Sequence, residues 1–443
     1  MPYLRAIFYL MTLIGLSACW KNDDLKQTST DAASATLHAT GTTHTSTASN
    51  DNQPSPHVIH VVPYRKPETS EQVLSSELNQ AAINTVAQHV SDWQLAQFDI
   101  RSNKMRSEGR PSGIPNGWMY ATFEIGLWHW AVAANSLEQQ QTVMNLSALN
   151  EYQLGPRVYH ADDHAIGDVY LSIYNKFGGK QRIENTLAHL DQVLAQPKTG
   201  SLEFVNSDKE TMELLHRKFT DPVCTTRWCW ADAVFMSPPV FAHLSKITGD
   251  NKYLDFMDKE FWLMTEYLYD KDYDLYLRDS RYFSRKDEQG RPIFWGRGNG
   301  WVLAGLARML EYMPTDFANR QAYIALFQEL SAALLKYQNP DGSWPSSLLE
   351  KGVDTHPETS ATGLLAFGLA WGINQGLLTE QAYTDSVTAA WQSIVSNIAA
   401  QGKVGFVQQV AFAPGSAKQE DTQLYGSGAV LLAAAELYKL AQK

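Results

Sequence analysis

Aspartates and tryptophans stand directly before several apolar segments of this chain, a combination that could transfer protons next to a ring-shaped ligand. Asp162 and Asp163 precede one such segment, and Asp232 follows Trp230 in front of another. Aspartate is a preferred N-cap residue, so each of them alone has an ordinary structural explanation. A carboxyl group near a tryptophan and a second carboxylate can, however, keep a raised pKa and donate a proton near neutral pH. Carboxyl groups at two helix starts of one fold therefore favour acid-base chemistry.

The most specific string is 295–301, which reads Trp-Gly-Arg-Gly-Asn-Gly-Trp. We expect its three glycines to take positive φ and to let the backbone approach a ligand. Arg297 offers a planar guanidinium suited to a carboxylate, between the rings of Trp295 and Trp301. The helix that follows begins with free N–H groups, which also favour an anion. The structural alternative is a turn between helices with buried tryptophans.

These strings belong to an internal repeat in which a polar or glycine-rich cluster leads six times into an apolar helix. Helices with one apolar and one polar face lie before and between them, as expected for helices covered on one side. The expected inner helices span 119–134, 166–177, 233–247, 302–312, 361–373 and 429–440, and the expected outer helices span 73–93, 137–149, 182–194, 253–268, 320–337 and 380–398. This alternation predicts an all-α fold, an (α/α)6 barrel whose inner helices begin at one mouth. The alternative is an open helical-repeat solenoid, whose repeats are usually shorter and more regular.

The amino-acid composition of the chain narrows the classes of ligand that it could bind. The formal net charge of −11 argues against nucleic acid or an anionic membrane surface, although a local arginine cluster can still bind an anionic sugar. The 13 tryptophans are compatible with stacking on sugar rings, although most tryptophan in any protein is simply core. No ligand-spaced cluster of His, Cys and Asp is visible, so we expect neither a metal nor another cofactor.

The start of the chain is typical of an exported protein. Arg5, an apolar run and Leu-Ser-Ala-Cys at 16–19 resemble a bacterial lipoprotein signal, with Cys19 as the lipidated residue. We therefore divide the chain into a signal peptide (1–19), a Ser/Thr-rich tether (20–72) and a catalytic domain (73–443). Trp20, rather than Asp, after the cysteine indicates lipid anchoring in the outer membrane. A plain secretory signal is the alternative.

Two cysteines, Cys224 and Cys229, lie inside the domain. Their spacing in an exported protein permits a local disulfide that would rigidify the loop before Asp232. Buried free thiols are the alternative.

Five strings together resemble glycoside hydrolase family 105, the unsaturated rhamnogalacturonyl hydrolases, and more distantly family 88. They lie at 230–236, 278–282, 295–301, 338–344 and 357–360, within a resemblance that covers about 82–440. The resemblance implies an (α/α)6 barrel without metal. It also implies an exo-acting enzyme for oligosaccharides left by polysaccharide lyases, which carry a 4,5-unsaturated uronic acid at the non-reducing end.

The resemblance also implies roles for single residues. Asp232, in a W-x-D motif, would be the general acid/base, and Asp162 or Asp163 would assist. The residues that match substrate-binding positions are Trp230, Trp295, Arg297, Trp301 and, more weakly, Tyr120, with Arg278 where many members carry histidine. Asp232 would protonate C4 of the enol ether while water attacks C5. The resulting hemiketal opens and releases the aglycone.

Two substrates remain open, unsaturated galacturonyl-rhamnose from pectin and unsaturated glucuronyl-rhamnose 3-sulfate from ulvan. Arg278 and Arg281 could contact a sulfate, but pairing with aspartate also explains them. Two other functions remain possible for this chain. One is a conventional inverting glycosidase on the same toroid, and the other is a carbohydrate-binding surface lipoprotein without catalysis.

Overall fold

The computed structural model describes residues 73–99, 104–107, 110–111, 113–204, 223–350 and 357–443. The chain divides into two units, Met1–His57 and Val58–Lys443, and everything described lies in the second. The predicted signal peptide, the lipidation site Cys19 and the tether 20–72 lie outside the described residues.

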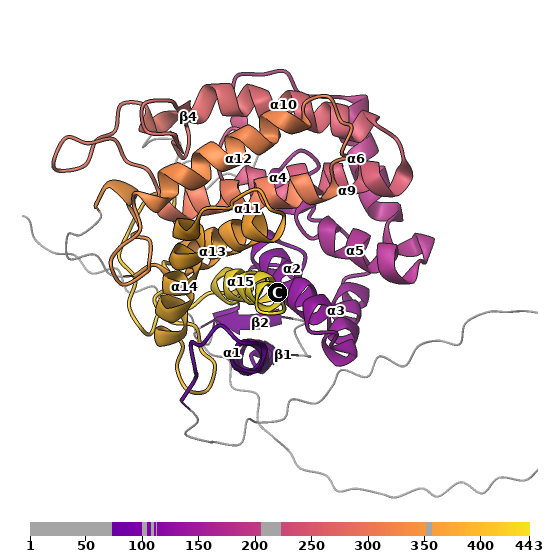
Figure 1. Cartoon of the computed structure of the whole chain (residues 1–443). Coiled ribbons are helices and arrows are strands. Elements are labelled where there is room, and N and C mark those ends of the chain that lie inside the picture. The colour runs from indigo at the N-terminus through magenta and orange to yellow at the C-terminus, as the bar shows by residue number, and fades with distance from the viewer. Residues whose placement is uncertain (1–72, 100–103, 108–109, 112, 205–222, 351–356) are drawn as a thin grey trace, which may run out of the picture. The chain divides into compact units, whose positions relative to one another are not determined.

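The described residues form inner helices surrounded by outer helices (Figure 1). The outer ones are α1 (Gln80–Leu95), α3 (Leu137–Leu149), α6 (Glu184–Ala195), α10 (Lys252–Leu268), α12 (Arg320–Leu335) and α14 (Gln381–Ser396). The inner ones are α2 (Trp118–Ala133), α4 (Ala161–His164) with α5 (Gly167–Phe177), α8 (Ala233–Met236) with α9 (Pro238–Thr248), α11 (Gly296–Tyr312), α13 (Thr359–Asn374) and α15 (Leu424–Leu440). The predicted (α/α)6 barrel is confirmed.

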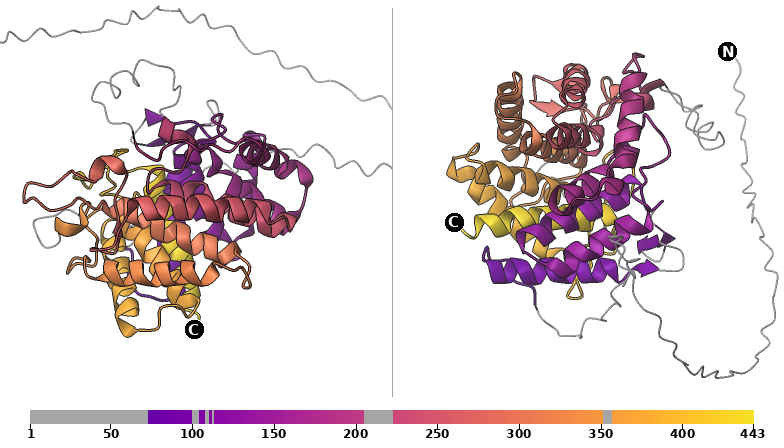
Figure 2. Two further views of the ribbon diagram at one scale, coloured as in Figure 1. Left: turned by 90° about the horizontal axis from the view of Figure 1, so that it is seen from above. Right: turned by 90° about the vertical axis from the view of Figure 1, so that its right-hand side faces the viewer.

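The inner helices close into a ring, which excludes the open solenoid. Each packs against the next around the ring, and α15 packs against α2. The right-hand view of Figure 2 shows α15 beside α1, which covers it from outside. Helices α2 and α15 cross at two glycines, where a Cβ added to Gly126 would lie 2.2 Å from the carbonyl oxygen of Gly428. This close approach explains why the inner helices are rich in small residues.

Several predicted helix boundaries are wrong: α11 and α15 begin at Gly296 and Leu424 rather than at 302 and 429. Two further differences have local chemical reasons. The first outer helix begins at Gln80 rather than 73, where the Asn79 side chain accepts a hydrogen bond from the Ala82 N–H at 2.9 Å. The third inner helix is broken after Met236, because Pro238 lacks the N–H that would continue the first segment.

The remaining elements are short. Strands β1 (Phe98–Asp99), β2 (Lys104–Ser107) and β3 (Arg110–Pro111) form an antiparallel sheet, and β4 (Tyr269–Asp270) pairs with β5 (Leu275–Tyr276). The 3-10 helices are η1 (Lys180–Arg182), η2 (Val223–Thr226), η3 (Ser280–Tyr282) and η4 (Leu348–Glu350). Among the described helices, none has the length and apolar character needed to cross a membrane.

Candidate active site

Asp232 lies at the start of α8, at the mouth of the ring. The backbone next to Asp232 is held by the segment at Arg278, because the Ala231 N–H donates a hydrogen bond to the Arg278 carbonyl at 2.8 Å. One carboxylate oxygen of Asp232, Oδ2, lies 3.4 Å from Nη2 of Arg278. The other, Oδ1, is buried without a hydrogen-bond partner among the described residues. A carboxyl group in this state has one oxygen available for a ligand.

The surroundings favour the protonated form of Asp232. Burial raises the pKa of the carboxyl, the charges of Arg278 and Arg297 lower it, and the charge of Asp162 raises it again. The net result is a pKa above the ordinary range of an aspartate. Asp232 therefore has the electrostatic environment of a proton donor.

The two neighbouring aspartates of α4 have different environments. Asp163 is buried and held by Arg157, whose Nη2 donates to Oδ1 at 2.6 Å and whose Nε donates to Oδ2 at 3.0 Å. Asp162 keeps 20% of its side chain exposed, and its Oδ2 lies 3.8 Å from Nδ1 of His160. Burial raises the pKa of Asp162 to about 7, although Arg157 opposes the shift. The geometry therefore favours Asp162 over Asp163 as the group that could take part in catalysis.

A compact group of charges adjoins Asp232. Asp279 is fully buried and accepts hydrogen bonds from Arg278 at 2.6 Å and from Arg281 at 2.7 and 2.8 Å. The guanidinium carbons of both arginines lie within 5.6 Å of the Phe204 and Phe412 rings. Burial alone would raise the pKa of Asp279, but the hydrogen bonds from Arg281 and the charge of Arg278 outweigh it and lower that pKa. Two cations share one firmly ionised carboxylate.

The contacts of Arg297 differ from those predicted. It is buried, and its Nη1 and Nη2 donate to the backbone carbonyls of Gln408 and Gln409 at 2.9 and 3.1 Å. Its guanidinium carbon lies 4.4 Å from the Trp295 ring and 5.0 Å from the Tyr425 ring. In this arrangement the guanidinium fixes the 408–409 backbone, and its contact with a substrate carboxylate stays a prediction.

The prediction of positive φ at the glycines of 295–301 is wrong. The segment is the first part of α11, and none of its glycines has positive φ. The glycines are needed for close packing instead. A Cβ at Gly296 would lie 2.4 Å from the Pro345 carbonyl oxygen, and one at Gly300 would lie 3.0 Å from the Leu364 Cβ.

The aromatic side chains that were predicted to contact the substrate are buried in this structure. Trp230, Trp295 and Trp301 are each less than 5% exposed, so their contact with a ligand stays a prediction. Tyr120 is buried, and its hydroxyl accepts from the Met105 N–H at 2.7 Å and donates to the Met105 carbonyl at 3.2 Å. Its structural role is therefore to hold β2 against α2, which gives the predicted ligand contact no support.

One aromatic residue was not predicted as a contact. Trp118 is only partly buried, stacks on Tyr425 with ring centroids 5.1 Å apart, and meets Trp301 edge-on at 6.3 Å. Its place at the start of an inner helix, like that of Asp232, was the available sequence signal.

The two cysteines of the domain are joined by a disulfide bond. Cys224 and Cys229 form a disulfide with Cα atoms 5.7 Å apart, and both are fully buried. The bridge fixes the turn that leads into Trp230 and Asp232. Free thiols are excluded by this pairing.

Metal binding finds no support in the described part of the chain, where no three His, Cys, Asp or Glu side chains form a group that could hold an ion.

An acidic residue with a raised pKa and a second carboxyl group, at the mouth of an (α/α)6 barrel, are the catalytic equipment of a glycoside hydrolase. The chain belongs to Glycosyl Hydrolase Family 88, whose sequence model matches residues 86–441. The predicted relationship to families 105 and 88 is thereby confirmed.

Relatives and a solved structure agree with this assignment. The chain is 38% identical over 80% of its length to an unsaturated 3S-rhamnoglycuronyl hydrolase of Alteromonas sp. (strain LOR), 84% of which is covered. It is 34% identical over 74% of its length to a protein of that name from Formosa agariphila, 85% of which is covered. The fold matches a family 88 glycosyl hydrolase from Bacteroides vulgatus with a TM-score of 0.69 and 23% identity, covering 82% of this chain and 99% of that one.

Proposed function

We propose that this enzyme removes a 4,5-unsaturated uronic acid from the non-reducing end of oligosaccharides produced by polysaccharide lyases. One observation carries the proposal. Asp232 has a raised pKa and a buried Oδ1 without a hydrogen-bond partner among the described residues, at the mouth of a family 88 barrel. The names of the two relatives, both unsaturated 3S-rhamnoglycuronyl hydrolases, support the same substrate class.

In the proposed reaction Asp232 donates its proton to C4 of the enol ether, and positive charge develops at C5 and the ring oxygen. Water adds to C5 as Asp162 accepts one of its protons. The resulting hemiketal opens to a ketone at C5 and leaves a hemiacetal at C1. That hemiacetal collapses to an aldehyde and releases the aglycone as an alcohol, so the usual relation between carboxyl separation and stereochemistry does not apply.

The cation group beside Asp232 supports a sulfated aglycone. Arg278 and Arg281 carry two positive charges against the one negative charge of Asp279, which leaves one positive charge for a substrate anion. Guanidinium groups are suited to oxyanions. Together with the 3S-rhamnoglycuronyl names of the relatives, this favours rhamnose 3-sulfate, the ulvan-type unit, over the unsulfated pectin unit.

The proposed location is the outer membrane, with a lipid on Cys19. This proposal rests on the sequence of residues 1–20 alone. Metabolic labelling with a fatty acid tests it, because the wild-type chain should incorporate label and Cys19→Ala should not. Labelling of both forms, or of neither, would contradict the proposal.

The activity is tested by following the ultraviolet absorbance of the conjugated uronate on lyase digests of ulvan and pectin in parallel. We expect loss of absorbance, faster on the sulfated digest. Equal rates would contradict the sulfate preference, and unchanged absorbance on both digests would contradict the function. Cleavage of a saturated uronyl analogue at the same rate would instead identify a conventional inverting glycosidase.

A further inference from the structure

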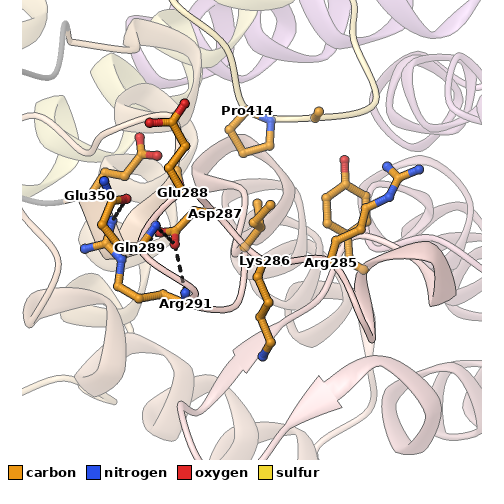
Figure 3. A pocket seen from close by; sticks show the side chains of 12 residues that line it. Arg285, Lys286, Asp287, Glu288, Gln289, Arg291, Glu350 and Pro414 are labelled. Atoms are coloured by element: carbon orange, nitrogen blue, oxygen red, sulfur yellow. Dashed lines mark hydrogen bonds and ion pairs between the residues drawn. The ribbon is translucent and has the colours of Figure 1, made fainter. Parts of the chain in front are cut away.

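A pocket lies next to η3, outside the group of residues assigned to catalysis. It encloses about 630 Å³, within the range of roughly 300–1,000 Å³ usual for small-ligand sites. Its walls come from three segments, the turn 285–291, the stretch from Ser347 to Glu350, and Ala413 with Pro414. Figure 3 shows Arg285 and Lys286 on one side of this pocket and Glu288 and Glu350 on the other.

The pocket shares its wall with the active site. Tyr282 lines it, and the Tyr282 hydroxyl donates to the Phe412 carbonyl at 2.5 Å. The Phe412 ring in turn lies 5.2 Å from the guanidinium carbon of Arg278, the residue that contacts Asp232. The pocket and the catalytic carboxyl are thus connected through η3 and the 412–414 segment.

The lining contains polar groups without partners. Ser347 is 3% exposed, and its Oγ has no hydrogen-bond partner among the described residues. A buried hydroxyl left unpaired is costly, and a ligand hydroxyl could satisfy it. Lys286 is exposed and makes no ion pair within the described part of the chain, whereas Arg291 is paired with Asp287 at 2.7 Å. The pocket therefore has a cation without an ion pair at its rim, and a buried unpaired hydroxyl belongs to one of its lining residues.

The walls match a sugar that carries an anion. Arg285 packs on the Tyr282 ring, with its guanidinium carbon 5.1 Å from the ring centroid, and forms a cationic wall with Lys286. The opposite wall has the acceptors Glu288 and Glu350, which suit sugar hydroxyls. A purely anionic ligand would be repelled by this wall, and a purely apolar one would leave Ser347 unpaired.

We propose that this pocket is a distal subsite, which binds a sugar unit bearing a sulfate or carboxylate further along the oligosaccharide than the bond cleaved. The inference rests on the proposed function, because the substrate must extend from Asp232 toward the pocket. It predicts that the enzyme favours tetrasaccharides over disaccharides with the same unsaturated end.

The test compares kcat/KM for a disaccharide and a tetrasaccharide from one lyase digest. Wild type should prefer the tetrasaccharide. Ser347→Ala and Lys286→Ala should each lower kcat/KM about two- to tenfold for the tetrasaccharide and leave the disaccharide unchanged, the scale of one hydrogen bond or ion pair. Lys286→Glu, an exposed charge reversal that should fold normally, should lower it further. Lys271→Ala, an exposed lysine in the turn between β4 and β5, is the matched control and should change neither substrate.

Equal kcat/KM for both substrates in wild type, or equal loss on both in the variants, would overturn the subsite. Failure of the proposed function appears separately, as no turnover of the disaccharide by wild type. In that case calorimetric titration of wild type and Lys286→Glu with the tetrasaccharide still tests whether the pocket binds the oligosaccharide. Weaker binding by the variant supports the pocket, and identical binding overturns it.

Discussion

Arg278 contacts Asp232 much more loosely than it contacts Asp279, with nitrogen–oxygen distances of 3.4 Å and 2.6 Å. Because the charge of Arg278 is matched mainly by Asp279, Asp232 has a cation nearby without a strong hydrogen bond that would hold it ionised. Burial raises the pKa of Asp232, and the charges of Arg278 and Arg297 lower it too little to cancel that shift.

The pH dependence of activity tests the carboxyl pair. Asp232 must be protonated to donate a proton, and Asp162, whose pKa burial raises to about 7, must be ionised to accept one, so activity should fall as pH moves away from the optimum in either direction. We expect a bell-shaped profile of kcat/KM whose limbs belong to the pair. Asp162→Asn should remove the acid limb and move the basic limb to lower pH, because the charge that raises the pKa of Asp232 is gone. A basic limb that stays in place would contradict this coupling.

Asp163→Asn separates structure from catalysis at the adjacent position. The variant loses charge-assisted hydrogen bonds to Arg157, so the free energy of unfolding should fall by about 1–3 kcal/mol. The kcat of the folded variant should stay close to wild type. Denaturant unfolding and steady-state kinetics on the same preparation check both. A large loss of kcat with unchanged stability would make Asp163 the assisting residue.

Arg297→Lys tests the anchoring of the 408–409 backbone. Lysine keeps the charge but cannot bond both carbonyls with one planar fork. We expect the free energy of unfolding to fall by about 1.5–3 kcal/mol. Arg308, another buried arginine, bonds a backbone carbonyl of Phe235 with Nη1 and provides a comparison outside the site. If Arg297→Lys left stability unchanged and only raised KM, the earlier interpretation of Arg297 as a carboxylate ligand would be favoured.

The sequence could predict the inner and outer helices and the place of Asp232, because periodicity and helix starts are local properties. It could not predict that Arg297 bonds to a segment more than a hundred residues away, or that Asp163 rather than Asp162 is held by Arg157. Those choices depend on which side chains the closed ring brings together. The glycines of 295–301 had two possible explanations, positive φ and close packing, and only the positions of Pro345 and Leu364 decide between them.

The core contains a buried ion pair between Asp168 and Arg308, and its loss should lower the free energy of unfolding strongly. Asp168 lies 2.9 Å from both Arg308 and His243, all of them buried. Burial would raise the pKa of Asp168, but the charges and hydrogen bonds of Arg308 and His243 together outweigh it and hold the pKa below the ordinary range. Asp168→Ala leaves Arg308 buried without this partner and should cost about 3–5 kcal/mol of unfolding free energy. Asp191→Ala, which removes a half-exposed partner of Lys252 and the acceptor of the Tyr253 hydroxyl, should cost less than Asp168→Ala.

The pH dependence gives a second readout of that pair. A carboxyl with a lowered folded-state pKa stabilises the fold above its unfolded pKa, and this contribution is lost as pH falls toward the folded value. The difference between wild type and Asp168→Ala should therefore be full at neutral pH and shrink in acid. A difference that grows on acidification would contradict the assigned charge state.

A chelator should leave the rate unchanged, because the proposed steps use only carboxyl groups and water. The check is an assay of the purified domain before and after treatment with EDTA. Inactivation that a divalent ion reverses would show that a metal takes part.

The most direct test of the central claim is the rate at which Asp232→Asn removes the ultraviolet absorbance of an unsaturated uronyl disaccharide. Asparagine has nearly the same shape but cannot donate the carboxyl proton, so kcat should fall by about 10²-fold or more. Circular dichroism and substrate binding should remain those of wild type. Turnover near the wild-type rate by the folded variant would contradict the role of Asp232 as the proton donor.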